Sequence, residues 1–211
     1  MSFAKEENAI FYHPYEKEEI LPTRMITYTA NEKLTETIST SNSGLRINAF
    51  NTTIVSHELV DGVGTIVFEK DVTSVGEYAF YGCSGLTSIV IPDSVTYIGK
   101  GAFADCTSLI SINIPDGVTS IGGQTFVACS GLTSVVIGSG VTSIEETAFG
   151  GCSGLNEITC NAITAPTINN NTFLNVKSGG ILKVPAGSDY SSWMSTNNYY
   201  LGKYNWTVQE I

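Results

Sequence analysis

The chain has 211 residues, enough for one domain, or a small domain with an appendage, that buries a core without metals or disulfides. Only 14% of its residues are charged whereas 42% are hydrophobic, which excludes the disordered and coiled-coil classes. Twenty acidic against ten basic residues give a formal net charge of −10 without a local basic patch, so we expect no nucleic-acid partner. No apolar run approaches the roughly 20 residues that span a bilayer, so we expect no membrane insertion of this chain.

Residues 1–23 mix charges without periodicity, which predicts a flexible N-terminal arm. They contain no continuous apolar segment of the kind that a secretory signal peptide needs. Two interpretations stay open: the protein remains inside the cell, or a leader precedes this sequence.

Residues 24–71 predict a β-rich N-terminal cap. Strand-like pieces lie at 25–28, 45–47, 53–56 and 65–68, and an Asp61-Gly62 turn precedes the last one. Residues 64–71 also overlay half of the repeat that follows, so we expect this strand to begin the repeat stack.

The next part of the chain is an internal repeat. Four consecutive blocks of 23 residues run over 72–94, 95–117, 118–140 and 141–163, and a fifth, degenerate repeat spans 165–187 after a one-residue insertion. Such a period is typical of solenoids, whose units bury their apolar faces only against neighbouring units. The sequence therefore predicts a stack of repeats over 72–187.

One block shows how each coil is built. Leu86, Ile89 and Ile91 alternate as in a half-buried strand, and a Pro-containing turn at 92–94 reverses the chain. A second short strand-like segment over 95–99 leads to Gly101-Ala102-Phe103, where we expect a short helical or 3-10 turn. Stacked coils would place strands in parallel about 4.8 Å apart. Three core ladders follow: Phe80, Phe103, Phe126 and Phe149; Leu86, Leu109, Leu132 and Leu155; and Ile91, Ile114, Ile137 and Cys160.

The block resembles the BspA-like (Treponema pallidum-type) leucine-rich repeat family, whose members include bacterial cell-surface proteins. The matching residues are Cys83, Leu86, Ile89, Ile91, Pro92, Val95, Ile98, Gly99, Ala102 and Phe103. Departures are Gly138 in place of Pro, Glu145 in place of Gly, and Thr125 and Thr172 in place of Ala. The resemblance implies a leucine-rich-repeat solenoid, and a secreted or cell-surface protein of a host-associated bacterium involved in adhesion.

Residues 188–211 predict a small C-terminal cap. Ser188-Asp189 can cap the start of a helix over 190–197 that carries Trp193 and Met194, and a last strand follows at 206–208.

The five cysteines all fall in predicted core slots. Cys83, Cys106, Cys129 and Cys152 recur once per block, and Cys160 takes an Ile position. No short Cys spacing typical of zinc sites is present, so we expect no metal site. Stacked Cα atoms would lie within disulfide range, but parallel Cβ vectors oppose the dihedral angle of that bond, which favours buried free thiols.

We find no catalytic or cofactor-binding constellation in the sequence. The two histidines, His13 and His57, fall in the predicted arm and cap, and the adjacent Glu145 and Glu146 would not face each other. We therefore expect no enzymatic activity and no cofactor.

The outward residues of the repeat strands form the candidate site. They make two rows: Thr65, Ser88, Ser111, Ser134, Glu157 and Ile181; and Val67, Val90, Asn113, Val136, Thr159 and Lys183. We expect the binding face at Ser88, Val90, Ser111, Asn113, Ser134, Val136, Glu157 and Thr159. Alternatively, the valines are there only because β-branched residues favour strands.

We thus expect a non-enzymatic interaction module that binds a protein or glycan, on a host or neighbouring cell, through its strand face. Two alternatives stay open: an intracellular or phage-type scaffold repeat without a dedicated ligand, and a piece of a carbohydrate-active enzyme whose catalytic domain lies outside this sequence.

Overall fold

The computed structural model describes residues 21–30, 36–37, 45–46, 48–196 and 199–211. Most of the predicted flexible arm, residues 1–20, lies outside the described residues. At its end, a 3-10 helix, η1 (Pro22–Arg24), leads directly into the first strand.

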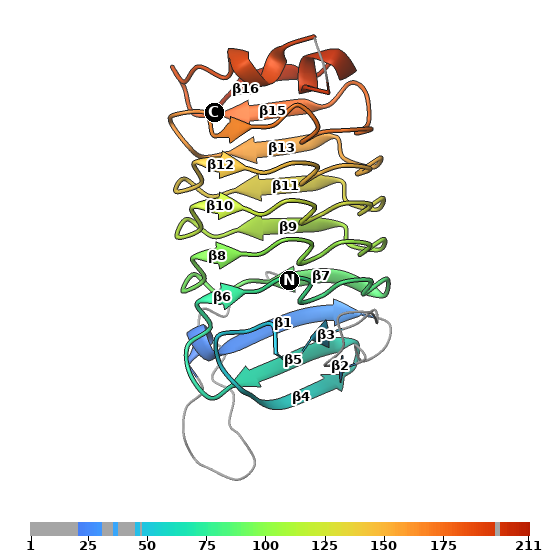
Figure 1. The fold of residues 1–211 in the computed structure, drawn as a ribbon, viewed down its shortest axis with the longest axis vertical. Helices are drawn as coiled ribbons and strands as arrows, with labels where there is room; N and C mark the ends of the chain where they lie inside the picture. The colour runs from blue at the N-terminus through green and yellow to red at the C-terminus, as the bar shows by residue number, and fades with distance from the viewer. Residues whose placement is uncertain (1–20, 31–35, 38–44, 47, 197–198) are drawn as a thin grey trace, which may run out of the picture.

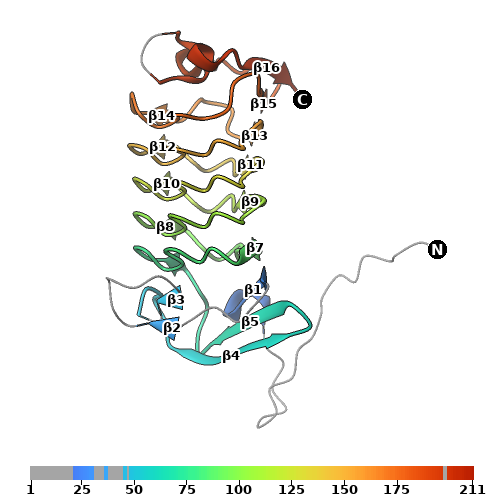
Figure 2. The same ribbon diagram turned by 90° about the vertical axis from the view of Figure 1, so that its right-hand side faces the viewer.

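The repeats stack into a solenoid with one parallel sheet on each side (Figures 1 and 2). The long strands are β7 (Leu86–Val90), β9 (Ser111–Ile114), β11 (Ser134–Ile137), β13 (Glu157–Cys160) and β15 (Ile181–Val184). The short strands are β6 (Ser74–Val75), β8 (Tyr97–Ile98), β10 (Ser120–Ile121), β12 (Ser143–Ile144) and β14 (Thr167–Ile168). The repeat is therefore one coil with two strands, which confirms the predicted solenoid.

The core is a set of columns that run along the stack, as the repeat predicts. Phe80, Phe103, Phe126 and Phe149 are fully buried, and Phe173 of the degenerate repeat continues their column. Neighbouring rings lie 5.1, 5.5, 5.3 and 5.7 Å apart and are inclined by no more than 11°. Phe103, Phe126 and Phe149 therefore each have an aromatic neighbour in the coil before and in the coil after.

The corner between the two sheets is not helical, so the expected helical or 3-10 turn at 101–103 is wrong. Gly101 and Asp105 have φ of 60°, and the equivalent residues of the other regular coils are also left-handed. A left-handed residue interrupts a right-handed helix, so the corner is a chain of tight turns instead. Among the described residues, 3-10 helices occur only outside the repeats, at the two ends.

The N-terminal cap is an antiparallel extension of the array. Strands β4 (Ile54–Val60), β5 (Val63–Phe68) and β1 (Met25–Ala30) pair in the order β4-β5-β1-β7, and β2 (Glu36–Thr37) pairs with β3 (Leu45–Arg46). The expectation that strand 65–68 stacks on the first coil is wrong, because β1 lies between them. Thr27 pairs with Val90 on one side and Thr65 on the other. Val67, expected to face outward, is only 8% exposed.

The C-terminal cap closes the other end with two short 3-10 helices, η2 (Ser191–Met194) and η3 (Leu201–Tyr204), and strand β16 (Thr207–Glu210). The expected helix over 190–197 is wrong, because residues 190–196, the described part of that span, form only η2. The N-cap residue of η2 is Tyr190, which makes no side-chain capping hydrogen bond, so the expected cap at Ser188-Asp189 is wrong. The Asp189 carboxylate accepts a hydrogen bond of 2.9 Å from the Ser191 amide in the turn before η2. The expected last strand is confirmed as β16, parallel to β15. Trp193 covers Phe173 at 5.4 Å between ring centroids and ends the aromatic column.

Candidate binding surface

The outward side chains of the long strands lie in register, as the repeat predicts. Ser134 stands between Ser111 and Glu157, and the second row carries Asn113, Val136, Thr159 and Lys183 in the same order. Because side chains alternate along a strand, Val135 and Ile137 point into the core between these outward residues. The surface formed by Val90, Ser111, Asn113, Ser134, Val136, Glu157 and Thr159 is named the strand face below.

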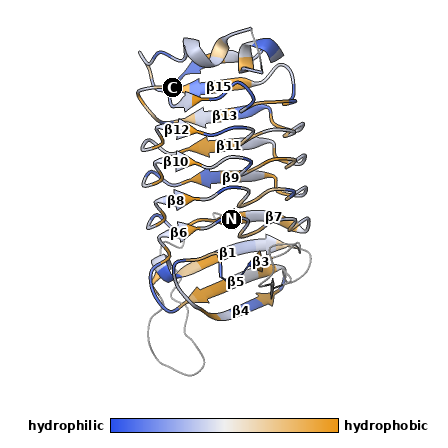
Figure 3. Ribbon diagram, viewed as in Figure 1, coloured by the Kyte–Doolittle hydropathy of each residue, from blue (hydrophilic) through white to orange (hydrophobic). Residues whose placement is uncertain are grey.

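The strand face is small, mostly uncharged and partly apolar. Val90 is 64% exposed, and Figure 3 draws β11, which carries Val136, in hydrophobic colour over most of its length. The charged pair is Glu157 with Lys183, whose Nζ donates a 2.8 Å hydrogen bond to a Glu157 carboxylate oxygen. This pair is half-buried at the C-terminal side of the face, and its two opposite charges neutralise each other.

The cap limits the strand face at its N-terminal end. Strand β7 pairs with β1, and the Thr29 hydroxyl lies 2.7 Å from the Ser88 hydroxyl and 2.6 Å from that of Thr87. The Ser88 side chain is therefore hydrogen-bonded to the cap, whereas Val90 is paired with Thr27 of β1 through the strand register and keeps its side chain exposed. Strand β7 still lies beside β9, and the Ile110 amide bonds to the Thr87 carbonyl (Figures 1 and 2). Val90 thus continues the row of Asn113 and Val136 across the junction between the two sheets.

The cysteines are buried free thiols, as predicted. The thiols of Cys106, Cys129 and Cys152 each donate a 3.1 Å hydrogen bond to a phenylalanine carbonyl of the preceding coil. Burial raises the pKa of Cys83 and of Cys129 to about 12, and raises the pKa of Cys106 well above its ordinary value. These groups are protonated near neutral pH and are poor nucleophiles.

The described part of the chain holds no group of three or more His, Cys, Asp or Glu side chains that could bind a metal ion. His57 is buried in the cap, 2.7 Å from the Tyr28 hydroxyl. His13 lies outside the described residues. Glu145 and Glu146 are both exposed, at a coil corner.

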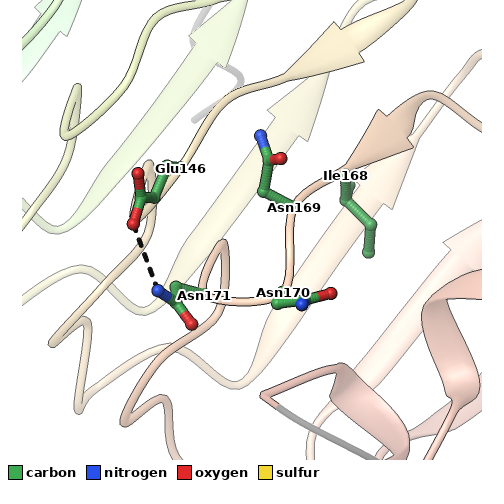
Figure 4. Close-up of a pocket in the computed structure, with 5 residues that line it drawn as sticks. All are labelled: Glu146, Ile168, Asn169, Asn170 and Asn171. Carbon is green, nitrogen blue, oxygen red and sulfur yellow. Dashed lines mark hydrogen bonds between the residues drawn. The ribbon is translucent and has the colours of Figure 1, made fainter.

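A polar pocket, which the sequence reasoning missed, lies at the corner of the fifth coil. It measures about 290 Å³ and is lined by Glu146, Ile168, Asn169, Asn170 and Asn171. Figure 4 shows Glu146 and Asn171 pointing toward each other, and the Asn171 amide donates a 3.1 Å hydrogen bond to Glu146. The sequence feature that could have indicated this pocket is a run of three consecutive asparagines, which occurs in none of the four regular blocks.

Residues 60–179 match the BspA type leucine rich repeat region family, with six copies of its repeat. The chain belongs to the BspA-type leucine-rich repeat family. The curated proteins yield no match to this BspA-type chain.

Three solved structures are similar to the BspA-type chain. A leucine rich cell surface protein from Faecalibacterium prausnitzii has a TM-score of 0.49 and 28% identity, with 63% of this chain and 33% of that chain covered. The pneumococcal vaccine antigen PcpA has a TM-score of 0.48 and 17% identity, covering 66% and 40%. A leucine-rich repeat protein from Bacteroides ovatus has a TM-score of 0.33 and 22% identity, covering 74% and 55%. The match thus spans about a third to just over half of these proteins' lengths.

No helix in the described ranges of this BspA-type chain is both long and apolar enough to cross a bilayer.

Proposed function

We propose that this BspA-type chain is a non-enzymatic interaction module, secreted or at the cell surface, that binds a protein or glycan through its strand face. The observation that carries the proposal is the register of the two outward rows. Asn113, Val136 and Thr159 occupy equivalent positions on adjacent strands and leave an uncharged ribbon open to solvent.

The chemistry of the ribbon favours contact with an extended partner. Outward side chains repeat about every 4.8 Å along the stack, so they present one continuous surface to a partner that follows the solenoid axis. Covering small uncharged side chains costs less desolvation than covering charges. The exposed Val90 adds apolar area at one end, and exposed apolar surface is typical of interaction sites.

The absence of enzymatic activity is proposed from the state of the reactive groups. The five thiols are buried, four of them in the repeating core ladder and Cys160 in an inward strand position. His57 is held against Tyr28 inside the cap. The secreted or surface location is proposed from membership of the BspA-type family.

A binding screen of the chain against extracellular-matrix proteins, mucins and glycans tests the proposal, with Val90→Lys/Val136→Lys as the variant. The inward neighbours Ile89, Val135 and Ile137 are unchanged by it, so stability should change by no more than about 1 kcal/mol. The new charges should abolish binding, because they must be desolvated on contact.

Lys100→Ala and Asp105→Ala, at the coil corners, serve as matched controls and should bind as the parent does. If the double-lysine variant binds as well as the parent while the controls are weakened, the strand face is only scaffold. If the chain binds nothing in the screen, the scaffold interpretation is favoured instead.

A further inference from the structure

The corner of the fifth coil breaks a hydrogen-bond pattern that joins the regular coils. At this corner the amides of Tyr78, Gly101 and Gln124 each donate to a carbonyl of the next coil. The fourth and fifth coils have no such bond within the described structure, and the Asn170 carbonyl accepts instead from the Tyr199 amide of the C-terminal cap. The first backbone bond of the fifth corner is thus made to the cap, whereas the Phe149 and Gly151 amides still donate to carbonyls of the fifth coil further along the corner.

The backbone conformation changes at the same place. Tyr78, Gly101, Gln124 and Thr147, which open this corner in the four regular coils, have φ between 54° and 60°. Asn171 takes the equivalent position in the fifth coil and is not left-handed. This altered turn coincides with the 290 Å³ pocket between the fourth and fifth coils (Figure 4).

Hydrogen bonds inside the pocket leave both donors and acceptors available. Asn171 donates to one oxygen of Glu146, so the other carboxylate oxygen and the Asn171 carbonyl oxygen remain acceptors. The Tyr200 hydroxyl donates a 3.0 Å hydrogen bond to the Asn170 side-chain oxygen, which leaves the Asn170 amide group as a donor. The side chain of Asn169 makes no hydrogen bond within the described residues and offers both kinds of group.

The lining selects a class of ligand. No Lys, Arg or His lines the pocket, so nothing there compensates the charge of an anion. The lining has one carboxylate, whereas calcium takes six to eight oxygen ligands, several of them usually carboxylates. An apolar ligand would leave the amides unpaired, at a cost in free energy. A neutral polyhydroxylated molecule pairs with donors and acceptors together, and the volume lies at the lower end of the range for small-molecule pockets.

We propose that the pocket lined by Glu146, Ile168 and Asn169–Asn171 binds one residue of a neutral saccharide. Ile168 supplies an apolar contact for the carbon-bearing face of the sugar, and the amides and carboxylate pair with its hydroxyls. The pocket adjoins β14 in the short-strand sheet, whereas the strand face belongs to the other sheet (Figure 2). This second site therefore does not depend on the proposed function of the strand face.

Amide NMR titration of the full chain with D-glucose, D-galactose, D-mannose, L-fucose and N-acetyl-D-glucosamine tests the proposal. At least one sugar should shift the amide signals of Asn169, Asn170 and Asn171 at millimolar concentration. Asn169→Ala and Glu146→Gln should each weaken that affinity several-fold, up to about tenfold. Asn156→Ala, an exposed asparagine beside β13, is the matched control and should leave the affinity unchanged.

Three outcomes overturn the proposal: no sugar shifts these amides, the shifts persist unchanged in both pocket variants, or they require added calcium. The Val90→Lys/Val136→Lys variant separates the two sites, because it should bind the sugar as the parent does. If a sugar instead shifts amides of β9 and β11 and this variant loses it, the pocket proposal fails while the strand face gains a glycan ligand.

Discussion

Phe103 and Phe126 stack across neighbouring coils with ring centroids 5.5 Å apart and ring planes inclined by 5°. Phe103 makes the same contact with Phe80 on its other side, at 5.1 Å. If the middle ring of such a column is removed, neither neighbouring ring can move to fill its space, because each neighbour is fixed by its own coil.

Phe103→Ala should therefore lower the free energy of unfolding by about 3 to 5 kcal/mol, since the variant loses apolar burial and leaves a cavity. Urea unfolding measures this change. Tyr97→Ala is the matched control, because Tyr97 lies in the same coil but is 46% exposed, and it should cost less than about 1 kcal/mol. A loss below about 1 kcal/mol for Phe103→Ala would contradict its central place in the column.

The thiols should not react with thiol reagents in the native protein. All five cysteines are buried and free, so a thiol reagent without reductant should count close to none in buffer and five in denaturant. A count of three or one in denaturant would reveal disulfides and contradict the structure.

Raised thiol pKa values also make stability depend on alkaline pH. The pKa of Cys129 rises from 9.0 to about 12 because burial disfavours the thiolate. Above pH 9 the unfolded chain releases a proton that the folded chain keeps, so this contribution is complete below pH 9 and is lost between pH 9 and about 12. The free energy of unfolding should fall as pH rises through this window.

Cys129→Ala isolates the effect from the titration of other groups. Its urea-unfolding free energy should fall less steeply between pH 8 and pH 10.5 than that of the parent, by up to about 1.4 kcal/mol per pH unit above 9. Equal slopes for the two proteins would show that Cys129 does not hold its proton in the folded state.

Thr147 is a β-branched residue at a left-handed position, with φ of 54°. Thr147→Gly should raise the free energy of unfolding by about 1 kcal/mol, because glycine adopts this conformation without steric cost. Thr142→Gly, in the same coil at a residue that is not left-handed, should instead lower it by about 0.5 to 1 kcal/mol. Thermal or urea unfolding of both variants decides the point, and equal destabilisation by the two would contradict the strain at Thr147.

The repeat alone could predict much of this molecule, because each coil packs against equivalent residues of the neighbouring coils. Equivalent residues such as Ser111 and Ser134 come into register through the period itself, and Cys160 could be placed in the core because it occupies an Ile position. Both predictions depend on the nearest coil only.

The parts that were not predicted depend on contacts that do not recur from one repeat to the next. Strand alternation in 65–68 indicates a strand but not its partner, so the insertion of β1 beside Val90 could not be foreseen. The helix expected near Trp193 is shorter because an isolated helix of eight residues is marginal without strong packing or capping. The pocket at Asn169–Asn171 lies at a corner where a distant cap residue, Tyr199, donates its amide hydrogen bond to the Asn170 carbonyl.

Site-specific photo-crosslinking of a partner obtained by the screen tests the central claim most directly. p-Benzoylphenylalanine introduced at Asn113, at the centre of the strand face, should crosslink to the bound partner, whereas the same group at Lys100, on a coil corner, should not. Crosslinking from Lys100 and none from Asn113 would show that the partner binds the corners and would contradict recognition through the strand face.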